Sequence, residues 1–210
     1  VKAEEEVKDD EEAKDDEEYV SNFCKKYNIE FYAKRIEIEK IAKESKVGTE
    51  EAGRIVRYKF FNEILEKTGS NKITTAHTAN DNAETVLMNI IRGSGTAGLK
   101  GIEPKSYNLI RPLINSSRDE IEEYCKTNNL NPRIDKTNFE NDYTRNKIRN
   151  IVIPYIKKEF NPNIIETMDR LSQVATDESN YIELQSQKMY EKLLIEKNKK
   201  QIILNLKEFN

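Results

Sequence analysis

The segment richest in groups that could do chemistry is residues 76–85, with the sequence AHTANDNAET. Periodicity places it where a strand ends and a helix begins, and such corners of open α/β sheets present backbone N–H groups and a helix dipole to a ligand. His77 and Asp81 could there transfer a proton or contact a ribose or a metal ion. The plainer interpretation is equally compatible with the pattern: Asp81 and Glu84 form a capping box, and His77 is a satisfied turn residue.

A second candidate is the glycine-rich segment 92–101, RGSGTAGLKG. It contains Gly-x-Gly-x-x-Gly, but a predicted helix precedes it instead of a strand, so it does not meet the dinucleotide-binding pattern. Either its backbone approaches a ligand closely or the loop merely turns sharply. The flanking cations Arg92 and Lys100 favour the ligand.

A third candidate is residues 135–138, DKTN, followed by 143–150, YTRNKIRN. Arg145 and Arg149 are four positions apart and therefore share one helical face. Their guanidinium groups suit phosphate or carboxylate, and Asn146 could contact a base or ribose edge. A surface salt-bridge face is an equally good interpretation.

The elements that must position these groups follow from hydrophobic periodicity. We expect strands at residues 31–36, 72–77, 109–113 and 201–206, and helices from Tyr19, at 49–69, at 81–92, from Ser117, at 144–158 and from residue 162 to about 193. Alternating strands and helices favour a Rossmann-like parallel sheet with flanking helices, followed by a helical linker.

Helix boundaries are marked by four residues. Thr49 should cap one helix and Gly69 should end it. Ser117 opens a capping box with Glu120, and Pro162 suits a first helical position.

Composition divides the chain into four parts. Residues 1–18 hold eleven acids against three Lys and should be disordered or a frayed helix. Residues 19–132 form a partial α/β domain, 133–160 a basic helical extension of it, and 161–210 a long linker helix and the start of a second domain. With the whole chain at −3 and the first 18 residues at −8, the rest carries +5, which is compatible with a polyanionic partner.

Several classes of protein are disfavoured. No apolar run approaches the roughly 20 residues that cross a bilayer, so we expect a cytoplasmic protein. Cys24 and Cys125 are best interpreted as reduced buried thiols. With one histidine and no cysteine cluster, we expect no metal site.

The candidate segments together resemble the tRNA(Ile)-lysidine synthetases of the PP-loop ATPase superfamily. The resemblance runs from about residue 17 to 178 and rests on residues 51–61, 77–95, 110–113 and 135–149. It implies that ATP, with Mg²⁺, activates C2 of the wobble cytidine of tRNA(Ile) with a CAU anticodon. The amine of free L-lysine then displaces AMP.

The resemblance also implies residue roles. The catalytic set is His77, Asp81, Arg92 and Arg111. The substrate-binding set is Glu84, Thr85, Arg145, Asn146 and Arg149. Gly93 and Gly95 should border the nucleotide, and no residue should bind a metal directly.

Three features depart from the family pattern. Family members begin with a strand and a Ser-Gly-Gly-x-Asp-Ser loop, and a later Asn-His-x-x-Arg-Gly motif follows; neither occurs here. Asn80 stands where the family usually has Asp. We therefore expect the chain to be N-terminally incomplete, with its first strand and loop missing, and inactive by itself.

Two other functions remain open. A tRNA thiolation enzyme would share the fold, but such enzymes usually rely on catalytic cysteines, whereas Cys24 and Cys125 lie on predicted helix faces. A catalytically inactive tRNA-binding module would use the basic helix. An exposed sheet edge would also favour a homodimer.

Overall fold

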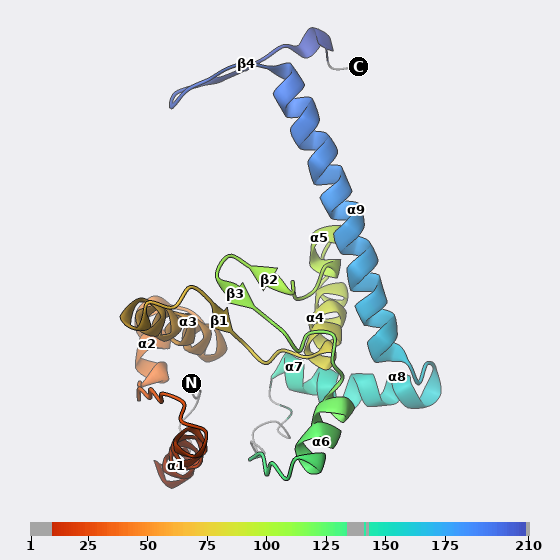
Figure 1. Ribbon diagram of the computed structural model, residues 1–210. Coiled ribbons are helices and arrows are strands. Elements are labelled where there is room, and N and C mark those ends of the chain that lie inside the picture. Colours follow the sequence, from red (N-terminus) through yellow and green to blue (C-terminus); the bar gives the residue numbers. More distant parts are fainter. Residues whose placement is uncertain (1–9, 134–140, 142, 209–210) are drawn as a thin grey trace. The chain divides into compact units, whose positions relative to one another are not determined.

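The computed structural model describes residues 10–133, 141 and 143–208 (Figure 1). The chain folds as two compact units. The first contains the residues up to Thr75 together with Lys105–Ile110, and the second contains Ala76–Pro104 and the residues from Arg111 onward.

The first unit combines helices with a small mixed sheet. Its elements are α1 (Asp10–Lys26), α2 (Ile38–Ser45), α3 (Thr49–Thr68), β1 (Ile73–Thr74), β2 (Lys105–Ser106) and β3 (Leu109–Ile110). The strand order is β1-β3-β2, with β1 parallel and β2 antiparallel to β3. The expected strands at 72–77 and 109–113 are thus confirmed as a short parallel pair.

The ends of α3 test two sequence predictions. Gly48, and not Thr49, is the N-cap, and Thr49 is the first helical residue. Gly69 ends the helix as expected, because its φ of 65° is left-handed and its N–H donates to carbonyl oxygens of the last turn.

Two other predictions for the first unit are wrong. Residues 31–36 form no strand. Within them Lys34 pairs with Glu63 at 2.8 Å and Arg35 with Glu17 at 2.8 Å. The helix expected from Tyr19 begins at Asp10, so the described part of the acidic segment is helical. Ala, Glu and Lys are strong helix formers, which favours this extension.

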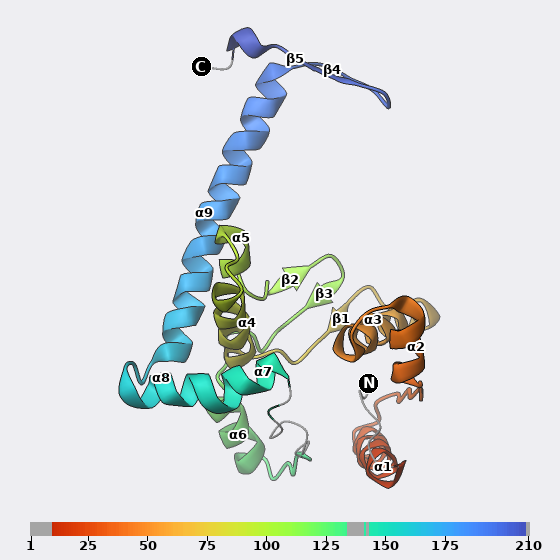
Figure 2. The same ribbon diagram turned by 180° about the vertical axis from the view of Figure 1, so that it is seen from behind.

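The second unit is mainly helical. Its elements are α4 (Ala79–Ile91), α5 (Thr96–Leu99), α6 (Arg118–Thr127), α7 (Thr144–Lys147), the π-helical turn η2 (Ile148–Val152), α8 (Ile153–Glu159), α9 (Ile164–Leu193), β4 (Leu194–Lys197), β5 (Ile202–Leu204) and the 3-10 turn η3 (Leu206–Glu208). Helix α9 runs alongside α4 and α5 (Figure 2). Antiparallel β4 and β5 form a hairpin after it.

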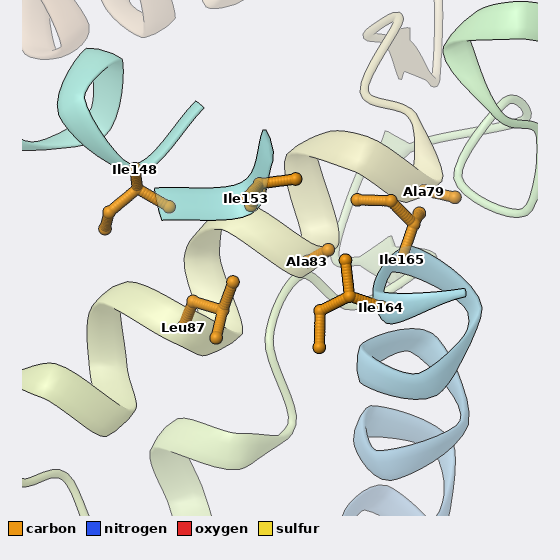
Figure 3. Packing of buried hydrophobic residues seen from close by; sticks show 7 residues of the cluster. All are labelled: Ala79, Ala83, Leu87, Ile148, Ile153, Ile164 and Ile165. Atoms are coloured by element: carbon orange, nitrogen blue, oxygen red, sulfur yellow. The ribbon is translucent and has the colours of Figure 1, made fainter. Parts of the chain in front are cut away.

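The core of the second unit is aliphatic. Seven buried side chains gather there: Ala79, Ala83, Leu87, Ile148, Ile153, Ile164 and Ile165 (Figure 3). They come from α4, from the η2–α8 segment and from the first turn of α9. The core therefore fixes α4 against the basic helical segment that carries two of the candidate arginines.

Most expected elements of the second unit are present. The capping box between Ser117 and Glu120 opens α6, and the basic helix is realised as α7, η2 and α8. Helix α9 begins at Ile164 with Asn163 as its N-cap, so Pro162 precedes the helix and is not its first residue. The expected strand at 201–206 is the shorter β5.

Two sequence predictions stay untested. Residues 135–138 of the third candidate segment lie outside the described residues. The four-part division of the chain also stays a prediction. Among the helices of the described ranges, none has the apolar length that crossing a bilayer would require.

Candidate functional site

The first turn of α4 is closed by a reciprocal cap. Thr78 is the N-cap, and its hydroxyl accepts from the Asp81 backbone N–H at 3.3 Å. Oδ2 of Asp81 accepts from the backbone N–H and the hydroxyl of Thr78, both at 2.8 Å. The capping box therefore joins Thr78 to Asp81, and the expected box between Asp81 and Glu84 is wrong. The carboxylate of Glu84 therefore takes no part in the cap.

Glu84 is the most buried carboxylate of this helix, with 1% of the residue exposed. Arg149 binds it in a bidentate fork, with Nε to Oε1 at 2.6 Å and Nη2 to Oε2 at 2.8 Å. Arg145 Nε donates to the same Oε2 at 2.9 Å. Charge-assisted forks of this kind are among the strongest side-chain hydrogen bonds in proteins.

Asp81 completes the arrangement. Its Oδ1 accepts from Arg145 Nη2 at 3.2 Å and from Arg149 Nη2 at 3.4 Å. We call Asp81, Glu84, Arg145 and Arg149 the ionic cluster. Its two negative and two positive charges balance, and it joins the start of α4 to α7 and η2.

The ionic cluster shifts the pKa values of Asp81 and Arg149 in the direction that keeps both charged. Burial raises the pKa of Asp81, but the charges of Arg145 and Arg149 and the hydrogen bonds from Thr78 outweigh it and hold that pKa below its usual value. Burial lowers the pKa of Arg149, yet the hydrogen bond and the charges of Glu84 and Asp81 raise it above its usual value. At neutral pH Asp81 is therefore a carboxylate and a weak base.

Arg145 is the member best placed to contact a ligand. It reaches the two carboxylates through Nε and Nη2, while 28% of its side chain stays exposed, against 15% for Arg149. Arg149 lies in the π-helical turn, a distortion that is frequent at functional sites. One partly exposed guanidinium, held in place by buried Glu84 and partly buried Asp81, is thus available to an anionic ligand.

Arg92, Gly93 and Gly95 do not join the ionic cluster. Arg92 is the C-cap of α4, eleven residues beyond Asp81, so the two lie about 16 Å apart along the helix. Gly93 and Gly95 follow it and are exposed. Their expected contact with the nucleotide stays a prediction.

Arg111 offers a buried donor. Its Nη1 donates to the Glu103 carbonyl oxygen, and within the described ranges its buried Nε has no hydrogen-bond partner. A buried polar atom without a partner is rare in native proteins and suggests a ligand acceptor at this point.

The remaining candidates lie near the ionic cluster along the chain. His77 directly precedes the N-cap, and Asn146 directly follows Arg145; both are partly buried. The Thr85 hydroxyl donates to the Asp81 carbonyl oxygen at 2.9 Å, so this side chain serves the helix backbone.

Two structural features near the ionic cluster were not predicted from the sequence. The Thr78-x-x-Asp81 spacing is itself a capping pattern and could have been found. The second feature is a contact of Asn80, whose Oδ1 accepts from the Arg118 N–H at 2.9 Å and so joins the start of α4 to the start of α6. This contact links segments 38 positions apart, and no local pattern indicates it.

The described residues fit phosphate better than a protein-held metal ion. No three His, Cys, Asp or Glu side chains in the described ranges gather where they could hold a metal. Asp81 and Glu84 already accept from arginines. The partly exposed guanidinium of Arg145 and the buried Nε of Arg111, by contrast, offer donors for anionic oxygens.

The sequence matches known proteins over most of its length. Residues 8–156 match the model of the PP-loop domain. A tRNA(Ile)-lysidine synthase of Clostridium acetobutylicum is 49% identical over 92% of this chain and 42% of its own length. Those of Clostridium perfringens and Clostridioides difficile are 46% and 45% identical over 91% of this chain, and over 41% and 42% of their own lengths. The chain thus spans about two fifths of the length of these relatives. The resemblance inferred from the sequence is confirmed.

A solved structure supports the fold. The U34-tRNA thiolase NcsA from Methanococcus maripaludis with its [4Fe-4S] cluster has a TM-score of 0.56 and 20% sequence identity, covering 76% of this chain and 58% of that one. The expected α/β fold of PP-loop type is therefore confirmed, although the described sheet also contains an antiparallel strand.

Proposed function

Since the chain belongs to the PP-loop domain family, we propose that it serves in ATP-dependent ligation of L-lysine to C2 of the wobble cytidine of tRNA(Ile), which gives lysidine by way of an adenylated cytidine. The observation that carries this proposal is the 45–49% identity to tRNA(Ile)-lysidine synthases over more than nine tenths of this chain. The ionic cluster adds to it, because all four members come from motifs on which the resemblance rests.

In this proposal Arg145 binds the phosphate of the adenylated cytidine or of the tRNA backbone. Glu84 and Asp81 accept from its Nε and Nη2 and so fix the orientation of the guanidinium, whose remaining N–H groups would face the phosphate. Preorganised donors stabilise developing negative charge without reorganisation. Arg149 lies deeper and acts by holding Glu84 in place.

Asp81 would orient the attacking amine instead of removing its proton. The lysine amine must be neutral to attack C2, and a carboxylate whose pKa lies below its usual value accepts protons poorly. His77, whose side-chain type titrates nearest neutral pH, is the better candidate base.

The partners follow from the same chemistry. ATP, accompanied by Mg²⁺, would supply the adenylyl group, and the donors of Arg145 and Arg111 would face its phosphate oxygens. We further propose free L-lysine and tRNA(Ile) with a CAU anticodon as substrates, a cytoplasmic location and a homodimer.

The test is transfer of labelled lysine to tRNA. The full-length product of the gene that encodes this chain is incubated with ATP, radiolabelled lysine and a tRNA(Ile) transcript bearing CAU. We expect acid-precipitable label in this transcript and none in a control transcript with GAU, which lacks cytidine at the wobble position. Absence of label from the CAU transcript would refute the proposal.

Thiolation of tRNA is the second candidate, because the similar solved structure is a tRNA thiolase. A [4Fe–4S] cluster is usually held by four cysteine thiolates. This chain has two cysteines, Cys24 in α1 and Cys125 in α6, which belong to different units. Replacing both with Ser should leave lysine transfer unchanged. Incorporation of sulfur into the tRNA in place of lysine, abolished by these substitutions, would favour thiolation.

A further inference from the structure

Asn82 sits in α4 between Asp81 and Glu84 but faces other partners. Only 3% of the residue is exposed. Its Nδ2 donates to Asp169 Oδ1 of α9 at 3.0 Å, and its Oδ1 accepts from the Ile102 N–H at 2.8 Å. One amide therefore binds α9 and the segment after α5 at the same time.

The segment that Asn82 binds packs closely on α4. Gly101 has φ of 63°, and a Cβ there would lie 2.1 Å from Asn82 Oδ1 and 2.8 Å from Val86 Cγ2. A side chain at position 101 would thus meet both an unfavourable backbone conformation and the surface of α4. Gly93 and Gly95, earlier in the same loop, have nothing within 4 Å of such a Cβ.

Two further side chains hold this loop by its carbonyl groups. Asn89 Nδ2 donates to the Gly98 carbonyl oxygen at 2.8 Å, and Ser172 Oγ of α9 donates to that of Lys100. The second half of the glycine-rich loop is therefore bound to the helices through its backbone.

We propose that the amide of Asn82 is the contact that fixes the loop 98–102 and α9 to α4. The ionic cluster holds α4 on one face, and Asn82 holds it on another. The position needs one donor for the Asp169 carboxylate and one acceptor for the Ile102 N–H, and an amide supplies both. The other Asp169 oxygen accepts from Gln173 at 2.7 Å, so this carboxylate is held in place.

The proposal is tested by exchanging donor and acceptor. Asn82→Asp places a second carboxylate against Asp169, and we expect the melting temperature to fall by about 5 °C or more and the Ile102 amide to exchange with solvent at least tenfold faster. In Asn82→Asp/Asp169→Asn the new asparagine donates to the new carboxylate, which still accepts from Ile102. We expect this pair to recover at least half of both losses.

The matched control is Asn82→Asp/Asp177→Asn. Asp177 lies on an exposed part of α9, the helix that carries Asp169. This variant therefore removes the same charge without supplying a donor to the new carboxylate at position 82. We expect no recovery.

Equal recovery in both double variants, or none in the Asp169 pair, would overturn the proposal, as would unchanged Ile102 exchange in Asn82→Asp. If Asn82→Asp alone does not fold, the comparison of the two double variants decides. Because no readout involves lysine transfer, failure here is distinguishable from failure of the proposed function.

Discussion

Replacing Glu84 with Gln should destabilise the second unit strongly. The change keeps the shape of the side chain but removes the buried charge to which both arginines donate. Breaking a buried ion pair by removing one partner typically costs about 3–5 kcal/mol. Arg145 and Arg149 are partly exposed and keep Asp81 as a counter-charge, so we expect the lower end, about 3 kcal/mol. For a chain of this length that lowers the melting temperature by roughly 6–12 °C.

The assay is urea denaturation, with the free energy of unfolding extrapolated to water for Glu84→Gln and for Glu178→Gln. Glu178 is an exposed carboxylate of α9, and its replacement should cost no more than about 0.5 kcal/mol. The double variant Glu84→Gln/Arg149→Gln should lose less stability than the sum of the losses of the two single variants. The reason is that Arg149→Gln removes a buried charge that had already lost its main counter-charge in Glu84→Gln. If Glu84→Gln is as harmless as its control, the ionic cluster contributes no stability and the reasoning fails.

Three further outcomes are expected. The folded-state pKa of Asp81 lies below its ordinary value, so the stability that Asp81 contributes is present above about pH 4 and is lost as pH falls. Asp81→Asn should therefore flatten the dependence of the urea midpoint on pH between 2.5 and 6, and an unchanged slope would contradict this. Thr78→Ala should cost about 1 kcal/mol and Thr78→Ser far less, since Ser retains the capping hydroxyl, and equal losses in calorimetry would argue against the cap. Gly101→Ala should lower the melting temperature more than Gly93→Ala, because both have positive φ but position 101 alone also meets Asn82, and equal effects would refute that contact.

The helix ends at Gly69 and Ser117 were predicted correctly from the sequence, because they depend only on neighbouring residues. Gly69 and the Ser117 capping box were identifiable because a left-handed C-cap and a hydroxyl three residues before a carboxylate act within one helical turn. Residues 31–36 read as a strand from their apolar and β-favouring types. In the structure their Lys and Arg side chains pair with carboxylates of α1 and α3 instead. Strand pairing depends on a distant partner, which no local pattern reveals.

The candidate site was predicted in part. The spacing of Arg145 and Arg149 correctly placed both on one face, and the alternative of a salt-bridge face was half right, because the ion pairs exist but are largely buried. The sequence could not show that their partners are Asp81 and Glu84, more than sixty positions earlier. Asn82 was missed for the same reason, since Asp169 lies 87 positions away.

Counting AMP and lysine in one reaction tests the ligase assignment most directly. With the full-length gene product and the CAU transcript, our account predicts one AMP released for each lysine joined to RNA. AMP released without lysine transfer would indicate another modification, and salt-sensitive RNA binding with neither product would indicate a binding module. Either result would contradict the account.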